Sequence, residues 1–133
     1  MRITDYTDYS LRVLIYVTAQ GDRLATIQEV ADRYDISKNH LMKVVHQLTR
    51  KGYLHSLRGK KGGIRLRRRP ADINLGILVR EMEVDLNLAE CFGLDNSCAI
   101  SPICSLKGVL DEALQAFLAT LDQYSLADIT PSS

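Results

Sequence analysis

The sequence predicts a mainly α-helical fold that contains one small β-hairpin, and three observations predict it. Two short apolar stripes with helical spacing are separated by only a few residues, as in a pair of helices joined by a tight turn. A short basic segment with glycines at its centre follows at once and has the pattern of a β-hairpin. A longer helical pattern ends the chain. Together these features indicate a winged helix-turn-helix with a two-stranded β wing and a long C-terminal dimerisation helix.

The first helix is expected over residues 4–19. Tyr6, Tyr9, Val13 and Val17 recur at three- and four-residue steps, and further apolar residues widen this face. A helix with so wide an apolar face is expected to be buried on two sides. The turn signal Gly21-Asp22 ends it.

The helix-turn-helix is expected at about residues 26–51. Thr26 and Glu29 have the spacing of a capping box, and Ser37 is a good N-cap for the second helix. Each helix has one apolar stripe at the spacing i, i+3, i+4, i+7. The stripes are Ile27, Val30, Ala31 and Tyr34 in the first helix, and Leu41, Val44, Val45 and Leu48 in the second.

The front of this second helix is polar and suits a recognition helix. Its side chains can hydrogen-bond to bases or phosphates, and those of its N-terminal end would meet base edges first. The predicted DNA-binding residues on this helix are Ser37, Lys38, Asn39, His40 and Lys43.

A basic hairpin is expected at residues 53–67 and would form the wing. Its turn contains three glycines, and the cationic side chains around the turn could enter a minor groove, where a narrow groove concentrates negative potential. The predicted DNA-binding residues of the wing are Arg58, Lys60, Lys61 and Arg65. Residues 1–70 would thus form the DNA-binding domain.

The charge distribution supports a polyanionic partner. Residues 36–71 contain eleven Lys or Arg and no Asp or Glu, whereas the whole chain has a net charge of only +1. The rest of the chain therefore carries −10. A local field of this size attracts phosphate whatever the total charge. The alternative is a solvated cationic face, but the charges fall on the positions that a DNA-reading helix and wing would use. Double-stranded DNA is therefore the expected partner.

Residues 71–133 are expected to contain a connecting helix over residues 71–90, a cysteine cluster loop and a dimerisation helix. Residues 71–90 carry a helical stripe, residues 91–104 contain the cysteines, residues 102–124 have a near-heptad apolar seam, and residues 125–133 are expected to be a loose tail. A helix of roughly 20 residues is about 30 Å long, so its apolar face needs a partner. A homodimer is the simplest source, and packing against the first helix of the same chain is the alternative.

Three cysteines, and no others, occur with the spacing Cys91-x6-Cys98-x5-Cys104. Structural zinc sites usually bring closely spaced cysteine pairs, whereas iron–sulfur clusters tolerate wider loops between thiolates. The spacing alone leaves open an iron–sulfur cluster, a zinc ion and free redox thiols. An iron–sulfur cluster commonly takes four ligands, so one ligand would come from elsewhere.

The composition argues against a membrane protein. No apolar run reaches the ~18 residues that span a bilayer, and the first residues do not have the layout of a signal peptide. The expected compartment is the cytoplasm, where thiols stay reduced.

The chain resembles the family of iron–sulfur winged-helix transcriptional repressors. The resemblance depends on the opening residues 1–12 (MRITDYTDYSLR), on the wing residues 58–63 (RGKKGG), and on the three cysteines ahead of a long final helix. It covers nearly the whole chain and is strongest to the nitric-oxide-sensing branch. The resemblance implies that Cys91, Cys98 and Cys104 hold the cluster. It also implies that Asp8 of the partner subunit supplies the remaining ligand, and Arg12 could orient Asp8 through an i, i+4 pair.

The function that this resemblance implies is that of a repressor and not of an enzyme. The expected homodimer binds operator DNA, carries one 2Fe-2S or 4Fe-4S cluster per subunit, and releases the DNA when nitric oxide nitrosylates the cluster. Three alternatives remain: a sensor of cluster supply or redox state on the same fold, a cysteine redox enzyme that uses Cys98 and Cys104, and a DNA-binding module without a cofactor.

Overall fold

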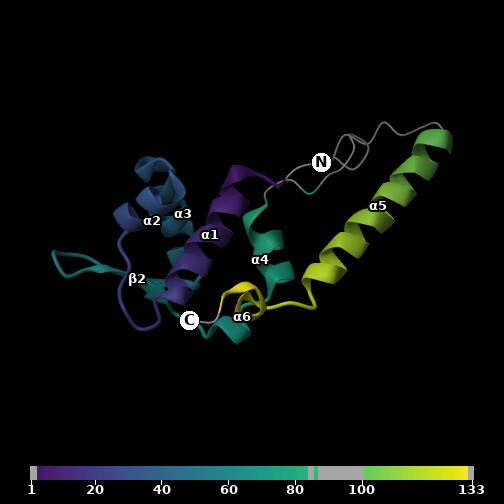
Figure 1. Cartoon of the computed structure of the whole chain (residues 1–133). Coiled ribbons are helices and arrows are strands. Elements are labelled where there is room, and N and C mark those ends of the chain that lie inside the picture. The colour runs from purple at the N-terminus through teal and green to yellow at the C-terminus, as the bar shows by residue number, and fades with distance from the viewer. Residues whose placement is uncertain (1–2, 84–85, 87–100, 132–133) are drawn as a thin grey trace.

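The computed structural model describes residues 3–83, 86 and 101–131, and its mainly helical fold with one two-stranded antiparallel sheet confirms the predicted fold class. The wing hairpin and the long helix extend from opposite sides of a helical core (Figure 1). The elements in chain order are α1 (Asp5–Ala19), α2 (Ile27–Tyr34), α3 (Lys38–Arg50), β1 (Leu54–Leu57), β2 (Gly63–Leu66), the 3-10 helix η1 (Pro70–Asp72), α4 (Leu75–Met82), α5 (Ser101–Leu121) and α6 (Leu126–Ile129).

Helix α1 occupies the centre of the core. The side chain of Thr4 caps it by accepting a hydrogen bond from the Thr7 amide, so the helix begins one residue later than the sequence suggests. Val13, Leu14 and Val17 are fully buried. The helix runs between the α2–α3 pair on one side and α4 on the other (Figure 1), which explains why its apolar face is so wide.

Helices α2 and α3 form the helix-turn-helix, and side chains cap both of them. Thr26 accepts a hydrogen bond from the Glu29 amide at 3.1 Å, and Ser37 accepts one from the His40 amide at 3.4 Å. Asp35 ends α2 in the left-handed region, at φ 54°, which turns the chain sharply into α3. All four residues of the apolar stripe of α3 are buried. The polar face of α3 is therefore on the outside.

Strands β1 and β2 form an antiparallel hairpin that pairs Leu54 with Leu66 and Leu57 with Gly63. The hairpin can turn tightly because of its glycines. Gly59 has a φ of 107°, which side chains rarely tolerate, and a Cβ on Gly62 would collide with the carbonyl oxygen of Leu57. These glycines are thus required by the geometry of the turn.

Helices α4 and α5 pack against each other through Val79 of α4 and Leu114 and Leu118 of α5, which form a second small core. Helix α4 is shorter than the connecting helix expected over residues 71–90, because Glu83 leaves the helical conformation at φ −84° and ψ 111°. Residues 84–85 and 87–90 lie outside the described residues. Helix α5 ends at Leu121, three residues before the expected end of the dimerisation helix.

The prediction of a loose tail over residues 125–133 is wrong for its first part. Residues 126–129 form the short helix α6, which begins with a capping box between Ser125 and Asp128. Leu126 is fully buried in the main core, and its amide donates a hydrogen bond to the Ile73 carbonyl at 2.9 Å. Burial of a single leucine, together with the cap, holds this segment on the domain.

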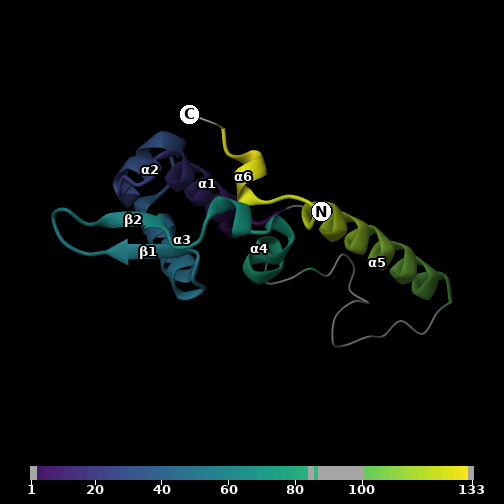
Figure 2. The same cartoon turned by 90° about the horizontal axis from the view of Figure 1, so that it is seen from below.

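The main core lies where α1, α2, α3, the base of the wing, α4 and α6 meet. Figure 2 shows α6 beside α1, with α5 leading away from this core. Among the described helices, none has both the length and the apolar character needed to cross a membrane.

Candidate nucleic-acid interface and metal centre

The first turn of α3 presents the side chains predicted to read bases. Lys38 and Asn39 are exposed, and within the described residues their side chains have no hydrogen-bond partner. The Ser37 side chain accepts the hydrogen bond that caps the helix, so this residue fixes where α3 begins. Lys38 and Asn39 are therefore the side chains of this turn that are free to contact DNA.

His40 differs from its neighbours because its ring packs against α1. The His40 and Tyr9 ring centroids are 4.8 Å apart in an edge-to-face arrangement, and His40 is only half exposed. The His40 ring thus contacts α1, and it also lies near the first turn of α3, where base contacts are predicted. The sequence alone gave no sign of this contact, because 31 positions separate the two residues.

Lys43 lies one turn further along α3, at the edge of a hollow of about 800 Å³ between α1, α3 and α4. His46 and Gln47 line the same hollow from α3, while Tyr6 and Met82 line it from α1 and α4. The exposed face of α3 therefore continues into a recess next to α1.

The wing presents its cations without neutralising partners in the described part of the chain. Arg58, Lys60, Lys61 and Arg65 are all exposed, and none takes part in an ion pair there. Residues 36–71 contain eleven Lys or Arg. Within the described residues, Arg69 is the only one of them that forms an ion pair, and its partner is Asp72. The local positive field expected from the sequence therefore remains available to a polyanion.

Asp8 and Arg12 form the expected i, i+4 pair on an exposed face of α1. The Arg12 Nε and an Asp8 carboxylate oxygen are 3.1 Å apart, and this hydrogen bond raises the pKa of Arg12. Arg12 also lies over the Tyr34 ring at 5.6 Å, which holds the guanidinium in place. Asp8 is thus oriented by Arg12 while its carboxylate remains partly exposed.

The three cysteines are described only in part. Cys91 and Cys98 lie outside the described residues, and Cys104 lies in the first turn of α5. Among the described residues, no three side chains of the metal-binding types come together. Three thiolates and one carboxylate would nevertheless be suitable donors for iron. Both views show the start of α5 well separated from α1 (Figures 1 and 2), which favours an Asp8 ligand from another subunit over one from the same chain.

Glu83 follows the last residue of α4 and contacts the start of α1. The chain continues from Glu83 toward the cysteines. The Glu83 carboxylate accepts hydrogen bonds from the Thr7 hydroxyl at 2.5 Å and from the Thr4 hydroxyl at 3.1 Å. Thr7 is fully buried and lies next to Asp8 in the sequence. This contact links the helix that carries Asp8 with the beginning of the cysteine-containing segment. This contact is not predictable from the sequence, because the two partners are 76 positions apart.

Comparison with known proteins gives a family match over nearly the whole chain. The model of the family Rrf2, described as an iron-dependent transcriptional regulator, matches residues 3–132. The HTH-type transcriptional regulator NsrR of Bacillus licheniformis is 54% identical over 131 residues, which cover 97% of this chain and 92% of that protein. NsrR of Bacillus subtilis is 53% identical over 131 residues, which cover 97% and 90% of the two chains.

A solved structure supports the fold independently. CymR, the global cysteine regulator of B. subtilis, superposes with a TM-score of 0.78 at 23% identity, and the match covers 97% of this chain and 95% of CymR. At this level of identity the likeness concerns the fold alone.

Proposed function

The chain belongs to the Rrf2 family of iron-dependent transcriptional regulators, and on that premise we propose that it responds to nitric oxide through an iron–sulfur cluster. It is a transcriptional repressor of the NsrR type with a winged-helix DNA-binding fold. The observation that carries the proposal is the identity of about half of all residues, over nearly the full length, with regulators named NsrR. The proposal concerns the cofactor, the signal, the assembly and the residues that perform each role.

The proposed DNA-binding surface is formed by α3 and the wing. Lys38 and Asn39 would contact base edges from the first turn of the recognition helix, while Lys60 and Lys61 would contact phosphates or a minor groove from the wing tip. Their exposure and their lack of partners within the described residues support this assignment. His40, held by Tyr9, would position the start of α3 as well as contact DNA.

The proposed cluster ligands are Cys91, Cys98 and Cys104 of one subunit and Asp8 of the partner subunit, with one cluster per subunit. When bound, an iron–sulfur cluster supplies iron that reacts with nitric oxide. A carboxylate is a harder and weaker ligand for this iron than a thiolate. Asp8 therefore suits the position on the cluster whose protein ligand would be released when nitric oxide binds. Arg12 would hold the free carboxylate in position, as the 3.1 Å contact between them indicates. Thiolate ligands need a reducing compartment, so we place the protein in the cytoplasm.

The proposed assembly is a homodimer that pairs two α5 helices. Leu106 and Val109 on α5 are more than half exposed, and they lie on the part of α5 that precedes its contact with α4. A second copy would cover them. In such a dimer, an Asp8 that binds the other subunit's cluster would fix the distance between the two reading heads. Release of Asp8 would leave α1 free, and the heads would no longer match two half-sites.

The experiment that tests this function is an operator gel shift with anaerobically purified protein, with and without a few equivalents of nitric oxide per iron. Wild type should be coloured, bind the operator, and lose most of its specific binding on exposure to the gas, with unchanged far-UV circular dichroism. Cys98→Ser should lose iron and colour. Asp8→Ala should keep both and respond weakly, because three thiolates remain. A coupling of about 1–3 kcal/mol between the two sites is sufficient for such a switch.

Three results would contradict the proposal. If operator affinity changes neither with nitric oxide nor with removal of iron, the protein is a DNA-binding module without a cofactor. Binding that follows iron removal but not the gas would indicate a sensor of cluster supply or redox state. Full iron content in Cys98→Ser would remove that cysteine from the site.

A further inference from the structure

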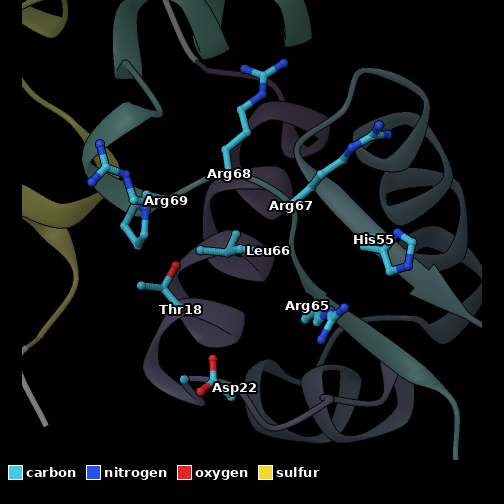
Figure 3. Close-up of a pocket in the computed structure, with 10 residues that line it drawn as sticks. Thr18, Asp22, His55, Arg65, Leu66, Arg67, Arg68 and Arg69 are labelled. Atoms are coloured by element: carbon cyan, nitrogen blue, oxygen red, sulfur yellow. The ribbon is translucent and has the colours of Figure 1, made fainter.

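A second cationic feature lies at the base of the wing, away from the residues assigned above to its tip. Four arginines, one histidine and one carboxylate lie around a hollow of about 520 Å³ between the end of α1 and β2. We call it the arginine hollow, and its charged or titratable residues are Asp22, His55, Arg65, Arg67, Arg68 and Arg69. Figure 3 shows Asp22 and Thr18 on the α1 side of the hollow and the arginines along its other borders.

The arginines differ in how they are held. The Arg68 guanidinium lies over the Tyr53 ring at 4.4 Å and donates a hydrogen bond to the Lys51 carbonyl at 3.0 Å. Arg69 pairs with Asp72 at 3.0 Å. Arg65 and Arg67 are exposed, and in the described part of the chain neither guanidinium has a hydrogen-bond or ion-pair partner.

The backbone places Arg65 and Arg67 in a row that continues the wing. Arg65 lies in β2 opposite His55, and the Arg67 amide still donates to the Tyr53 carbonyl at 3.0 Å, so the ladder continues past the end of the strand. Two residues of extended backbone span roughly 7 Å. The phosphates of one DNA strand also form a row of regularly spaced negative charges, so a row of exposed arginines is suited to contact them.

We infer that the arginines on the border of this hollow bind the sugar–phosphate backbone of the operator, with Arg67 as the principal contact. The inference rests on the proposed DNA-binding function and extends the interface beyond α3 and the wing tip. Guanidinium groups are well suited to phosphate because they donate several hydrogen bonds in one plane. Arg68 and Arg69 would add to the local field from fixed positions, while Arg67 is free to move onto a phosphate.

The direction of the side chains favours a backbone over a compact free anion. In Figure 3 the guanidinium groups of Arg67, Arg68 and Arg69 spread apart instead of converging on one point. Such a fan suits charges distributed along a strand. The Asp22 carboxylate on the opposite border weakens the site for any anion. Removal of this negative charge should therefore strengthen the contact that Arg67 makes.

The test measures operator affinity as a function of salt for Arg67→Gln, Asp22→Asn and wild type. Loss of one phosphate contact should reduce the slope of log K against log salt by about 0.9 and weaken binding about fivefold at 0.15 M salt. Asp22→Asn should bind more tightly than wild type. Lys107→Gln makes the same charge change on α5, far from the wing (Figure 1), and should leave the slope unchanged at protein concentrations where sedimentation shows that the variant is a dimer.

The possible outcomes separate this inference from the proposed function. If wild type binds the operator and Lys60→Gln reduces the slope but Arg67→Gln does not, the hollow is not a backbone contact although the protein binds DNA. If wild type does not bind the operator, the proposed function itself fails. Tripolyphosphate, titrated into wild type and Arg67→Gln by calorimetry at constant ionic strength, tests a free anion as the source. If tripolyphosphate binds to wild type but not to Arg67→Gln, and Arg67→Gln does not change the salt slope of operator binding, the assignment to the DNA backbone is overturned.

Discussion

Replacement of Thr7 by valine tests the contact between α1 and Glu83. Valine has nearly the same shape as threonine but cannot donate the 2.5 Å hydrogen bond to the Glu83 carboxylate. A hydrogen bond to a charged group contributes about 1.5–3 kcal/mol. Glu83 is half-buried and keeps its contact with Thr4 at 3.1 Å, so the lower part of this range applies. We expect the free energy of unfolding to fall by about 1.5–2 kcal/mol.

The assay is urea unfolding followed by circular dichroism, at one fixed protein concentration because a dimer's stability depends on concentration. Thr18→Val is the matched control. It removes a hydroxyl from the same helix, and within the described residues the only hydrogen bond of this hydroxyl is to the Leu14 carbonyl. In a Glu83→Gln background the effect of Thr7→Val should shrink to about 1 kcal/mol, because a neutral acceptor remains. If Thr7→Val destabilises no more than Thr18→Val, the contact does not fasten α1 to the start of the cysteine-containing segment.

Three further predictions concern the wing, the core and acid stability. Lys60→Gln should reduce the salt slope of operator binding by roughly one unit and weaken binding to all sequences alike; an unchanged slope would rule out a phosphate contact there. Leu126→Ala should cost about 2–5 kcal/mol in urea unfolding, whereas Ile129→Ala, 39% exposed on the same helix, should cost far less; equal costs would mean that α6 does not anchor the chain. Arg23 holds the pKa of Glu29 at about 2, against an ordinary 4.5, so the stabilisation from this pair is complete above pH 4.5 and is lost as the pH falls toward 2. Wild type should therefore lose more stability than Glu29→Gln between those pH values, and parallel curves would refute the role of the pair.

The helices of the DNA-binding domain were predictable because their signals are local. The stripe that begins at Leu41 repeats at helical spacing, and all four of its residues are buried. Thr26 and Ser37 cap the helices at the positions that the sequence indicated. The tight wing followed from its glycines for the same reason, since the turn requires them at fixed positions.

The features that the sequence did not predict depend on contacts between distant segments. Leu126 lies in a segment too short to show a helical stripe, and only the core that receives it explains why α6 forms. The Tyr9–His40 ring contact depends on how α1 crosses α3, and no sequence spacing encodes that crossing. The arginine hollow depends on the end of α1 lying beside β2, so the sequence showed the charge of Arg67 but not its surroundings.

Helix α5 is clamped to the rest of the molecule near one end. Arg80 of α4 pairs with Asp122 at 2.6 Å, and the Asn74 side chain donates to the Asp122 carbonyl at 2.8 Å, just before α6 enters the core. From Leu114, where the contact with α4 lies, to Ser101 the helix projects about 20 Å as a stiff rod. Rotation of such a rod by about 5° at the clamp moves its tip by roughly 1.7 Å. The first turn of α5, which contains Cys104, is at that tip. In the proposed switch, a movement of ångström size at the start of α5 would therefore become a change of angle at the DNA-binding domain.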